Sequence, residues 1–139
     1  MTAKVKSKSK LKKEVWKIFS EYIRLRDCLK TTGTPDWGKC VTCGKEVSIK
    51  ACDAGHAVPG RGNAILFDET CTHLQCKRCN GPLGGNLLEY RRAIIRMYGE
   101  GYDEYLEQKA RKPSDFQVWE LETMKDVYRE KIKKLKEGK

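Results

Sequence analysis

The chain has 139 residues, a formal net charge of +10 and 35% charged residues, and its mean hydropathy is −0.70. This length fits one domain or a small core with helical extensions, and the composition leaves only a modest hydrophobic core. No apolar run is long enough to span a bilayer, which argues against a helical membrane protein. The basic excess favours a polyanionic partner, with nucleic acid first and an anionic membrane surface second.

Seven cysteines are enough for disulfides in a secreted protein, but the N-terminus is rich in Lys and Ser and lacks the apolar segment of a signal peptide. An odd count that includes two Cys-x-x-Cys pairs is more typical of zinc binding in a reducing compartment. We therefore predict a cytoplasmic protein with no membrane partner. Outside the two pairs, Cys28 and Cys52 are expected to be small buried hydrophobic side chains.

The N-terminal part of the chain predicts a tail, a helix and a linker. Residues 1–10 are expected to form a disordered basic tail, which either only keeps the protein soluble or contacts DNA phosphates. Residues 11–30 have apolar side chains at helical spacing and predict an amphipathic helix, and a turn-rich linker follows up to residue 38. The apolar face of the helix contains Leu11, Val15, Ile18, Phe19, Tyr22, Leu25 and Leu29.

Two Cys-x-x-Cys pairs, Cys40 with Cys43 and Cys76 with Cys79, predict four thiolate ligands for a single tetrahedral Zn²⁺. The alternative, a redox-active dithiol, requires a pair on a β-α-β unit, and neither pair lies in such a context. A site closed by four thiolates has no open coordination position. This zinc is therefore expected to be structural, and any hydrolytic chemistry must use other residues and another ion.

The segment around the two pairs predicts the central core. Residues 46–51 alternate weakly and predict a strand, residues 53–56 should lie on or just after the next strand, and residues 72–75 predict a further strand that leads into a helix. Two strands and a helix around a metal form a ββα-metal core, which we assign to residues 39–99. The predicted fold class is α+β, with this small zinc-stapled core flanked by N- and C-terminal amphipathic helices.

Three more helices are predicted towards the C-terminus. They cover residues 86–98, a short segment at 103–109, and a long segment that opens with a capping-box pattern at Ser114 and ends near Lys136. We treat residues 100–139 as a helical extension. The expected apolar positions are Leu87, Tyr90, Ile94 and Met97 in the first of these helices, and Phe116, Trp119, Val127 and Leu135, with Tyr128 and Ile132 beside them, in the long one.

Three polar residues in the core are candidates for catalysis. His56 has small neighbours and a glycine-rich loop beyond it, so a phosphate backbone can approach, and a neutral imidazole is suited to act as a general base. Asn80 follows the last cysteine directly and can ligate a hard cation such as Mg²⁺, although it can also simply cap a helix. Asp53 is the nearby carboxylate. His73 is expected to pack or to hydrogen-bond.

Several motifs together carry a resemblance to a known family. They are the segments 19–27, 40–44, 53–56, 67–68, 73–80 and 85–91, within residues 11–98. In these segments the chain resembles the phage NinG recombination-protein family, which includes the lambda Rap Holliday-junction resolvase and belongs with the HNH (ββα-metal) nucleases. The resemblance implies a phage protein in the cytoplasm of a bacterial host, with an HNH-like nuclease core.

The resemblance also implies a reaction and its residues. The expected activity is that of an HNH-type endodeoxyribonuclease acting on branched recombination intermediates, with 5′-phosphate and 3′-hydroxyl products. His56 corresponds to the general base, and Asn80 to a ligand of a catalytic Mg²⁺ or Mn²⁺. Phage endonuclease VII has an Asp directly before its base, where this chain has Gly55. The second ligand therefore stays open between Asp53 and Glu89.

The remaining expectations concern DNA and assembly. The residues expected to contact DNA phosphates are Arg61, Lys77, Arg78, Arg91, Arg92 and Arg96. Symmetric cutting of a four-way junction needs two active sites, so we predict a homodimer held by one or both amphipathic helices. Two alternatives stay open: a zinc-stapled DNA-binding recombination protein without catalytic activity, and a general HNH endonuclease without preference for junctions.

Overall fold

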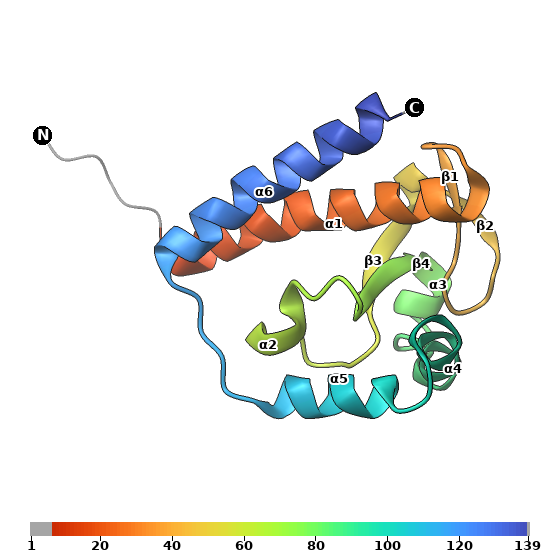
Figure 1. Ribbon diagram of the computed structural model, residues 1–139. Coiled ribbons are helices and arrows are strands. Elements are labelled where there is room, and N and C mark those ends of the chain that lie inside the picture. The colour runs from red at the N-terminus through yellow and green to blue at the C-terminus, as the bar shows by residue number, and fades with distance from the viewer. Residues whose placement is uncertain (1–6, 139) are drawn as a thin grey trace, which may run out of the picture.

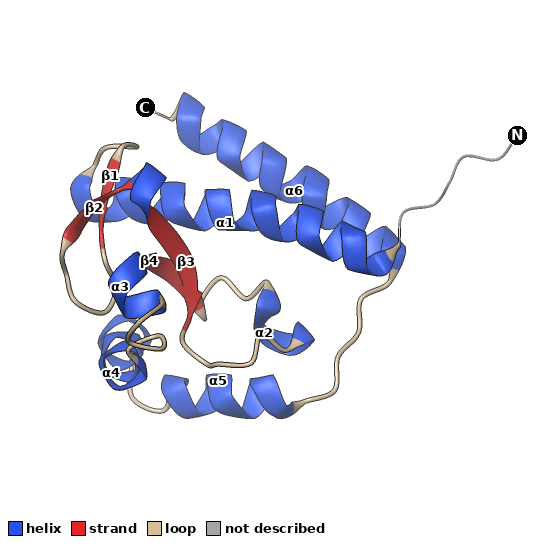
Figure 2. Cartoon of the chain, turned by 180° about the vertical axis from the view of Figure 1, so that it is seen from behind, coloured by secondary structure: helices blue, strands red, loops and turns tan. Residues whose placement is uncertain are grey.

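The computed structural model describes residues 7–138, which form six α-helices and two antiparallel two-stranded sheets. Two long helices, α1 (Lys8–Thr32) and α6 (Val118–Glu137), lie side by side along one side of the molecule (Figure 1). The hairpin of β3 and β4 lies against α1, and the shorter helices lie on the far side of this hairpin (Figure 2). The predicted α+β class is confirmed.

Helix α1 begins at Lys8, where the side chain of Ser7 caps it by accepting a hydrogen bond from the backbone N–H of Lys10 at 3.1 Å. It ends before Gly33, which takes a left-handed conformation with φ 78°. The predicted boundary at residue 11 was therefore too late, because the serine cap was not recognised. Residues 1–6 of the predicted tail lie outside the described residues.

Helices α1 and α6 bury their apolar faces against each other and against the hairpin. Phe19 stands edge-on to Tyr128, with 5.0 Å between the ring centroids, and Ala54 of β3 joins the same cluster. A second cluster brings Leu11 against Leu121. At about 25 cal/mol per Å² of apolar surface, contacts of this kind supply most of the stabilisation of both helices.

The predicted apolar stripe of the long helix was partly wrong. Its cap is Gln117, which forms a capping box with Glu120, so the helix starts later than the pattern at Ser114 indicated. Trp119 is 67% exposed and Val127 is 43% exposed. The buried face contains Tyr128 and Ile132, which were predicted beside the stripe, together with Leu121, which was not. The predicted apolar face of α1 is thus largely covered within one chain, whereas Trp119 and Val127 of the α6 stripe stay exposed.

Two short sheets follow α1. Strand β1 (Trp37–Lys39) pairs with β2 (Glu46–Ser48), and β3 (Cys52–His56) pairs with β4 (Thr72–Cys76). The first of these strands was missed within the turn-rich linker. The strand predicted over residues 46–51 ends at Ser48, because this side chain caps a 3₁₀ turn, η1 (Ile49–Ala51), by accepting from the N–H of Lys50.

The remaining helices are α2 (Asn63–Leu66), α3 (Lys77–Asn80), α4 (Leu87–Tyr98) and α5 (Tyr102–Arg111). Tyr90 of α4 is fully buried and donates a hydrogen bond to the carbonyl of Gly55 at 2.6 Å. This bond anchors α4 to β3. The predicted apolar face of α4 was only partly right, since Leu87 and Met97 are each 38% exposed.

Buried polar groups connect α1 to the hairpin. Asp27 is buried and accepts a hydrogen bond from the backbone N–H of Leu74 at 2.8 Å, while the neighbouring Arg26 holds its carboxylate at 2.8 Å. A buried charge of this kind is tolerated because it is paired. Cys28 and Cys52 are buried, as predicted.

His73 has the packing and hydrogen-bonding role that was predicted for it. Its Nδ1 lies 3.1 Å from the hydroxyl of Tyr90 and its Nε2 lies 2.8 Å from the hydroxyl of Tyr98. Burial disfavours the charged imidazolium and lowers the pKa of His73 to about 4.

This lowered pKa predicts a pH dependence of stability. Below the ordinary pKa of about 6.5, His73 is protonated in the unfolded chain but stays neutral in the folded chain. Stability is therefore lost as the pH falls from about 6.5 towards 4. His73→Gln keeps hydrogen-bonding groups but removes this titration. In denaturant unfolding, the free energy of unfolding of this variant should then change with pH less steeply than that of the parent, by about 1.4 kcal/mol per pH unit in this window. Equal slopes in the two proteins would contradict the assignment.

Candidate metal centre and active site

The two Cys-x-x-Cys pairs meet in space. The sulfur atoms of Cys40, Cys43, Cys76 and Cys79 all lie within 4.8 Å of one another, and three of the four residues are buried. The first pair lies in the turn between β1 and β2, and the second spans the end of β4 and the start of α3. This group can hold one zinc ion, as the spacing predicted.

The geometry of the cluster fits zinc. A tetrahedron with Zn–S bonds of about 2.3 Å has edges of about 3.8 Å, and the Sγ atoms of Cys43 and Cys76 lie 3.8 Å apart. Backbone N–H groups also point at the sulfurs: that of Cys76 at Cys40, 3.3 Å away, and that of Cys79 at Cys76, 3.4 Å away. Such donors stabilise thiolates, the form that binds metal.

Asp53 and Asn80 lie side by side next to this centre. Strand β3 carries Asp53, and α3 ends at Asn80, whose Nδ2 donates to Asp53 Oδ2 at 3.1 Å. The ammonium group of Lys77 contacts the other carboxylate oxygen at 2.8 Å. Partial burial raises the pKa of Asp53, but the hydrogen bonds from Lys77 and Asn80 outweigh it and lower the pKa below its ordinary value.

His56, at the end of β3, is held in a defined tautomer. Its Nε2 lies 3.0 Å from the backbone carbonyl oxygen of Leu66. A carbonyl only accepts, so Nε2 must carry the hydrogen, and in the neutral ring Nδ1 keeps the free lone pair. Within residues 7–138, no hydrogen bond occupies Nδ1. Burial lowers the pKa of His56 from 6.5, so the ring is neutral near pH 7.

Trp16 of α1 forms the wall behind His56. The two rings are stacked, with 5.2 Å between centroids and 23° between planes. The guanidinium of Arg61 lies 4.5 Å from the centroid of the same indole, a cation–π contact. Arg61 also has φ 49°, a left-handed conformation that non-glycine residues rarely adopt. The indole therefore fixes both the imidazole and the guanidinium.

Two adjoining cavities place these groups around one open surface. One, of about 170 Å³, is lined by His56, Asn80, Arg61 and Trp16 among others. The other, of about 420 Å³, is lined by Asp53 and Arg24 and shares Trp16, Arg61 and Asn80 with the first. The structure thus brings together the predicted residues His56, Asn80, Asp53 and Arg61.

Two residues of this surface were missed in the sequence, Trp16 and Arg24. Together with Ser20 they form an i, i+4, i+8 stripe of α1, next to the apolar face. The Nε of Arg24 is held by Ser20, and one of its terminal nitrogens donates to the carbonyl of Ile49 at 3.1 Å. The stripe is visible in the sequence, but its place opposite β3 depends on tertiary packing.

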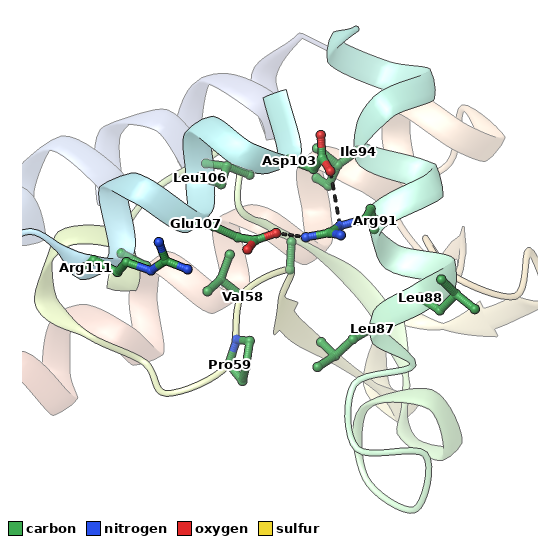
Figure 3. Close-up of a pocket in the computed structure, with 12 residues that line it drawn as sticks. Val58, Pro59, Leu87, Leu88, Arg91, Ile94, Asp103, Leu106, Glu107 and Arg111 are labelled. Atoms are coloured by element: carbon green, nitrogen blue, oxygen red, sulfur yellow. Dashed lines mark ion pairs between the residues drawn. The ribbon is translucent and has the colours of Figure 1, made fainter. Parts of the chain in front are cut away.

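The basic residues predicted on α4 are less available than expected. Arg91 forms ion pairs with Asp103 and Glu107 of α5, across a cavity of about 630 Å³ (Figure 3). Arg92 pairs with Glu89 on its own helix. Glu89 is thereby engaged away from the two cavities around His56, and it is not among their lining residues. Arg96 and Arg78 are exposed.

Comparison with known proteins places the chain in a family. The family model described as "Bacteriophage Lambda NinG protein" matches residues 1–138. The chain belongs to the NinG family. It is 31% identical over 101 residues to the proteins named ninG of Escherichia phage 933W and Salmonella phage P22, and 29% identical over 101 residues to that of phage lambda.

These NinG relatives are longer than this chain. The matched segment covers 72% of the chain but only 49% of the phage 933W protein, so the chain spans about half the length of its curated relatives. No solved structure was found that matches it. Among residues 7–138, no helix is long and apolar enough to cross a membrane.

Proposed function

We propose that this NinG-family protein is a metal-dependent DNA endonuclease in which His56 is the general base. The observation that carries the proposal is the free Nδ1 of a neutral imidazole beside the pair of Asp53 and Asn80. An HNH-like nuclease needs such a base within reach of a water molecule and a phosphate. The hydrogen bond from Nε2 to Leu66 sets the tautomer that this role requires.

Asp53 and Asn80 have the ligand types that suit a catalytic Mg²⁺ or Mn²⁺. A carboxylate and an amide oxygen are hard ligands, and Mg²⁺ usually binds to one or two such groups and keeps several waters. The ammonium of Lys77 pairs with Asp53 in the structure, so a cation that binds to Asp53 would have to displace it. When bound, the ion would stabilise negative charge on the scissile phosphate and the leaving oxygen. His56 would take the proton of the attacking water at Nδ1.

The charge of the surface supports a nucleic-acid substrate. Arg24 and Arg61 line the cavities, and Lys77 and Arg78 stand on the exposed face of α3. A phosphodiester backbone laid across β3 would meet these cations, and small residues such as Gly84 and Gly85 would let it come close. Arg91 and Arg92 contribute less in this proposal, because carboxylates of the chain neutralise them.

The role of Arg61 can be measured through the salt dependence of DNA binding. Arg61→Gln should weaken DNA binding for all sequences and make the slope of log K against log salt less negative by about 0.9, the value for one lost phosphate contact. Arg129→Gln on α6, an exposed position outside both cavities, is the matched control and should leave the slope unchanged. Equal slopes for the two variants would remove Arg61 from the DNA interface.

We further propose that the substrate is branched DNA and that a homodimer makes paired cuts in it. We also propose that the protein acts in the cytoplasm of the bacterial host, where thiolates stay reduced. Because each chain has one His56, symmetric cutting needs two chains. The experiment compares a four-way junction with linear duplex in Mg²⁺, and measures light scattering with and without the junction. A dimer that cuts the junction faster is expected. A monomer that nicks both equally would indicate a general endonuclease.

One observation favours a second candidate. The ammonium of Lys77 forms an ion pair with the carboxylate of Asp53. This pairing is expected in a zinc-stapled DNA-binding protein that needs no second metal. Tight DNA binding without cleavage in either Mg²⁺ or Mn²⁺ would select this alternative. Lys77→Ala separates the two candidates further. In the endonuclease it leaves Asp53 open, so cleavage persists at saturating protein although affinity falls, whereas in the binding protein affinity falls and no cleavage occurs.

A further inference from the structure

Gln75 is a fully buried polar residue between the zinc centre and the active site. Its Nε2 donates to the carbonyl of Gly85 at 2.8 Å and to Oγ1 of Thr42 at 3.2 Å. Thr42 lies between the first two cysteines, and Gly85 lies in the loop after the last one. Gln75 therefore connects both metal-binding turns, and it lies on β4 directly opposite Asp53.

The other end of the carboxamide faces Gly55. Oε1 of Gln75 is the one buried side-chain oxygen or nitrogen atom without a hydrogen-bond partner in the described part of the chain. A Cβ atom at Gly55 would lie 2.0 Å from this oxygen and 3.0 Å from Oδ1 of Asn80. An alanine would clash with the carboxamide in this position, and the carboxamide is held there because its Nε2 makes two hydrogen bonds. The carboxamide thus fills the space of a side chain directly before His56.

We propose that Gln75 is a positioning residue. It sets how far β3, which carries Asp53 and His56, lies from Asn80 and from the zinc centre. Burying a polar atom without a hydrogen-bond partner costs free energy. Because both N–H groups of Nε2 are hydrogen-bonded while Oε1 is not, we infer that the surroundings hold the Gln75 side chain in this position. Gly55 and Gln75 act as a complementary pair: the glycine leaves the space and the carboxamide fills it. The inference rests on the proposed function for its activity readout only.

The complementarity is tested by a double-variant cycle. Gly55→Ala alone should slow plasmid nicking at least about tenfold, because it displaces the edge of β3 from Asn80. In a Gln75→Ala background the 2.0 Å clash is removed and only the 3.0 Å contact with Asn80 remains, so adding the alanine should change the rate by only about twofold. Gly62→Ala is the matched control, since its Cβ would lie 3.7 Å from the nearest atom. Equal effects of Gly55→Ala in both backgrounds would overturn the proposal.

A second readout does not depend on cleavage. The chain has only two histidines, so the imidazole signals of His56 and His73 can be assigned by NMR. Gln75→Met keeps the volume but loses both donors, and it should shift the His56 signals and pKa while zinc content stays unchanged. Unchanged His56 signals with a lower melting temperature would make Gln75 merely structural. Absence of nicking by the parent protein would refute the endonuclease but leave this measurement valid.

Discussion

Cys76→Ser should release the metal and unfold the centre of the protein. Structural zinc contributes roughly 10 kcal/mol or more to small metal-folded domains, about as much as the whole stability of an ordinary domain. Cys76 is part of this centre: its sulfur lies 3.8 Å from that of Cys43 and accepts the N–H of Cys79. Elemental analysis and circular dichroism should show loss of zinc and of most cooperative unfolding.

The matched control for this prediction is Cys52→Ser. Cys52 pairs with Cys76 across the β3/β4 hairpin and is equally buried, but it lies outside the cluster. Its thiol contacts the carbonyl of Ile49 at 3.5 Å, a contact that a serine hydroxyl can also make. This variant should keep its zinc and its cooperative transition. Parent protein that purifies folded but without stoichiometric zinc would refute the structural role of the metal.

His56→Ala should abolish cleavage while leaving zinc content and DNA affinity intact. General-base catalysis contributes about 10² to 10⁴ in rate. No other residue that lines this cavity offers an imidazole or a carboxylate to take its place. Single-turnover cleavage of a plasmid under saturating protein measures the loss. A variant that cuts as fast as the parent would make the assignment wrong.

The chain supplies its own control in the other histidine. His73→Gln should lose stability but keep the cleavage rate at temperatures where it is folded, because its ring hydrogen-bonds to the hydroxyls of Tyr90 and Tyr98 and does not line the cavities around His56. The pH profile provides a further check. Burial lowers the pKa of His56 below 6.5, so the rate should rise with pH below about 6.5 and level off above it. A rate that still rises steeply above pH 7.5 would indicate another base.

Local patterns determined much of this protein. The Cys-x-x-Cys spacing predicted the metal cluster, because two residues between ligands bring both sulfurs of one pair to the same ion and two such pairs complete a tetrahedral site. Helical periodicity placed α1, α4 and α5 to within a few residues, since each buries one continuous face. The roles of His73 and Cys28 followed from residue type, because imidazoles and thiols at apolar positions are usually buried.

Tertiary structure decided what these patterns left open. Trp16 and Arg24 belong to the site only because α1 crosses β3, and Arg91 is neutralised only because α5 folds back on α4. The buried face of α6 depends on its cap at Gln117 and on the surface that α1 presents, so the sequence stripe alone placed Trp119 wrongly. Contacts between residues far apart in the chain have no local signature. For the same reason, the fit of Gln75 against Gly55 is visible only in the folded chain.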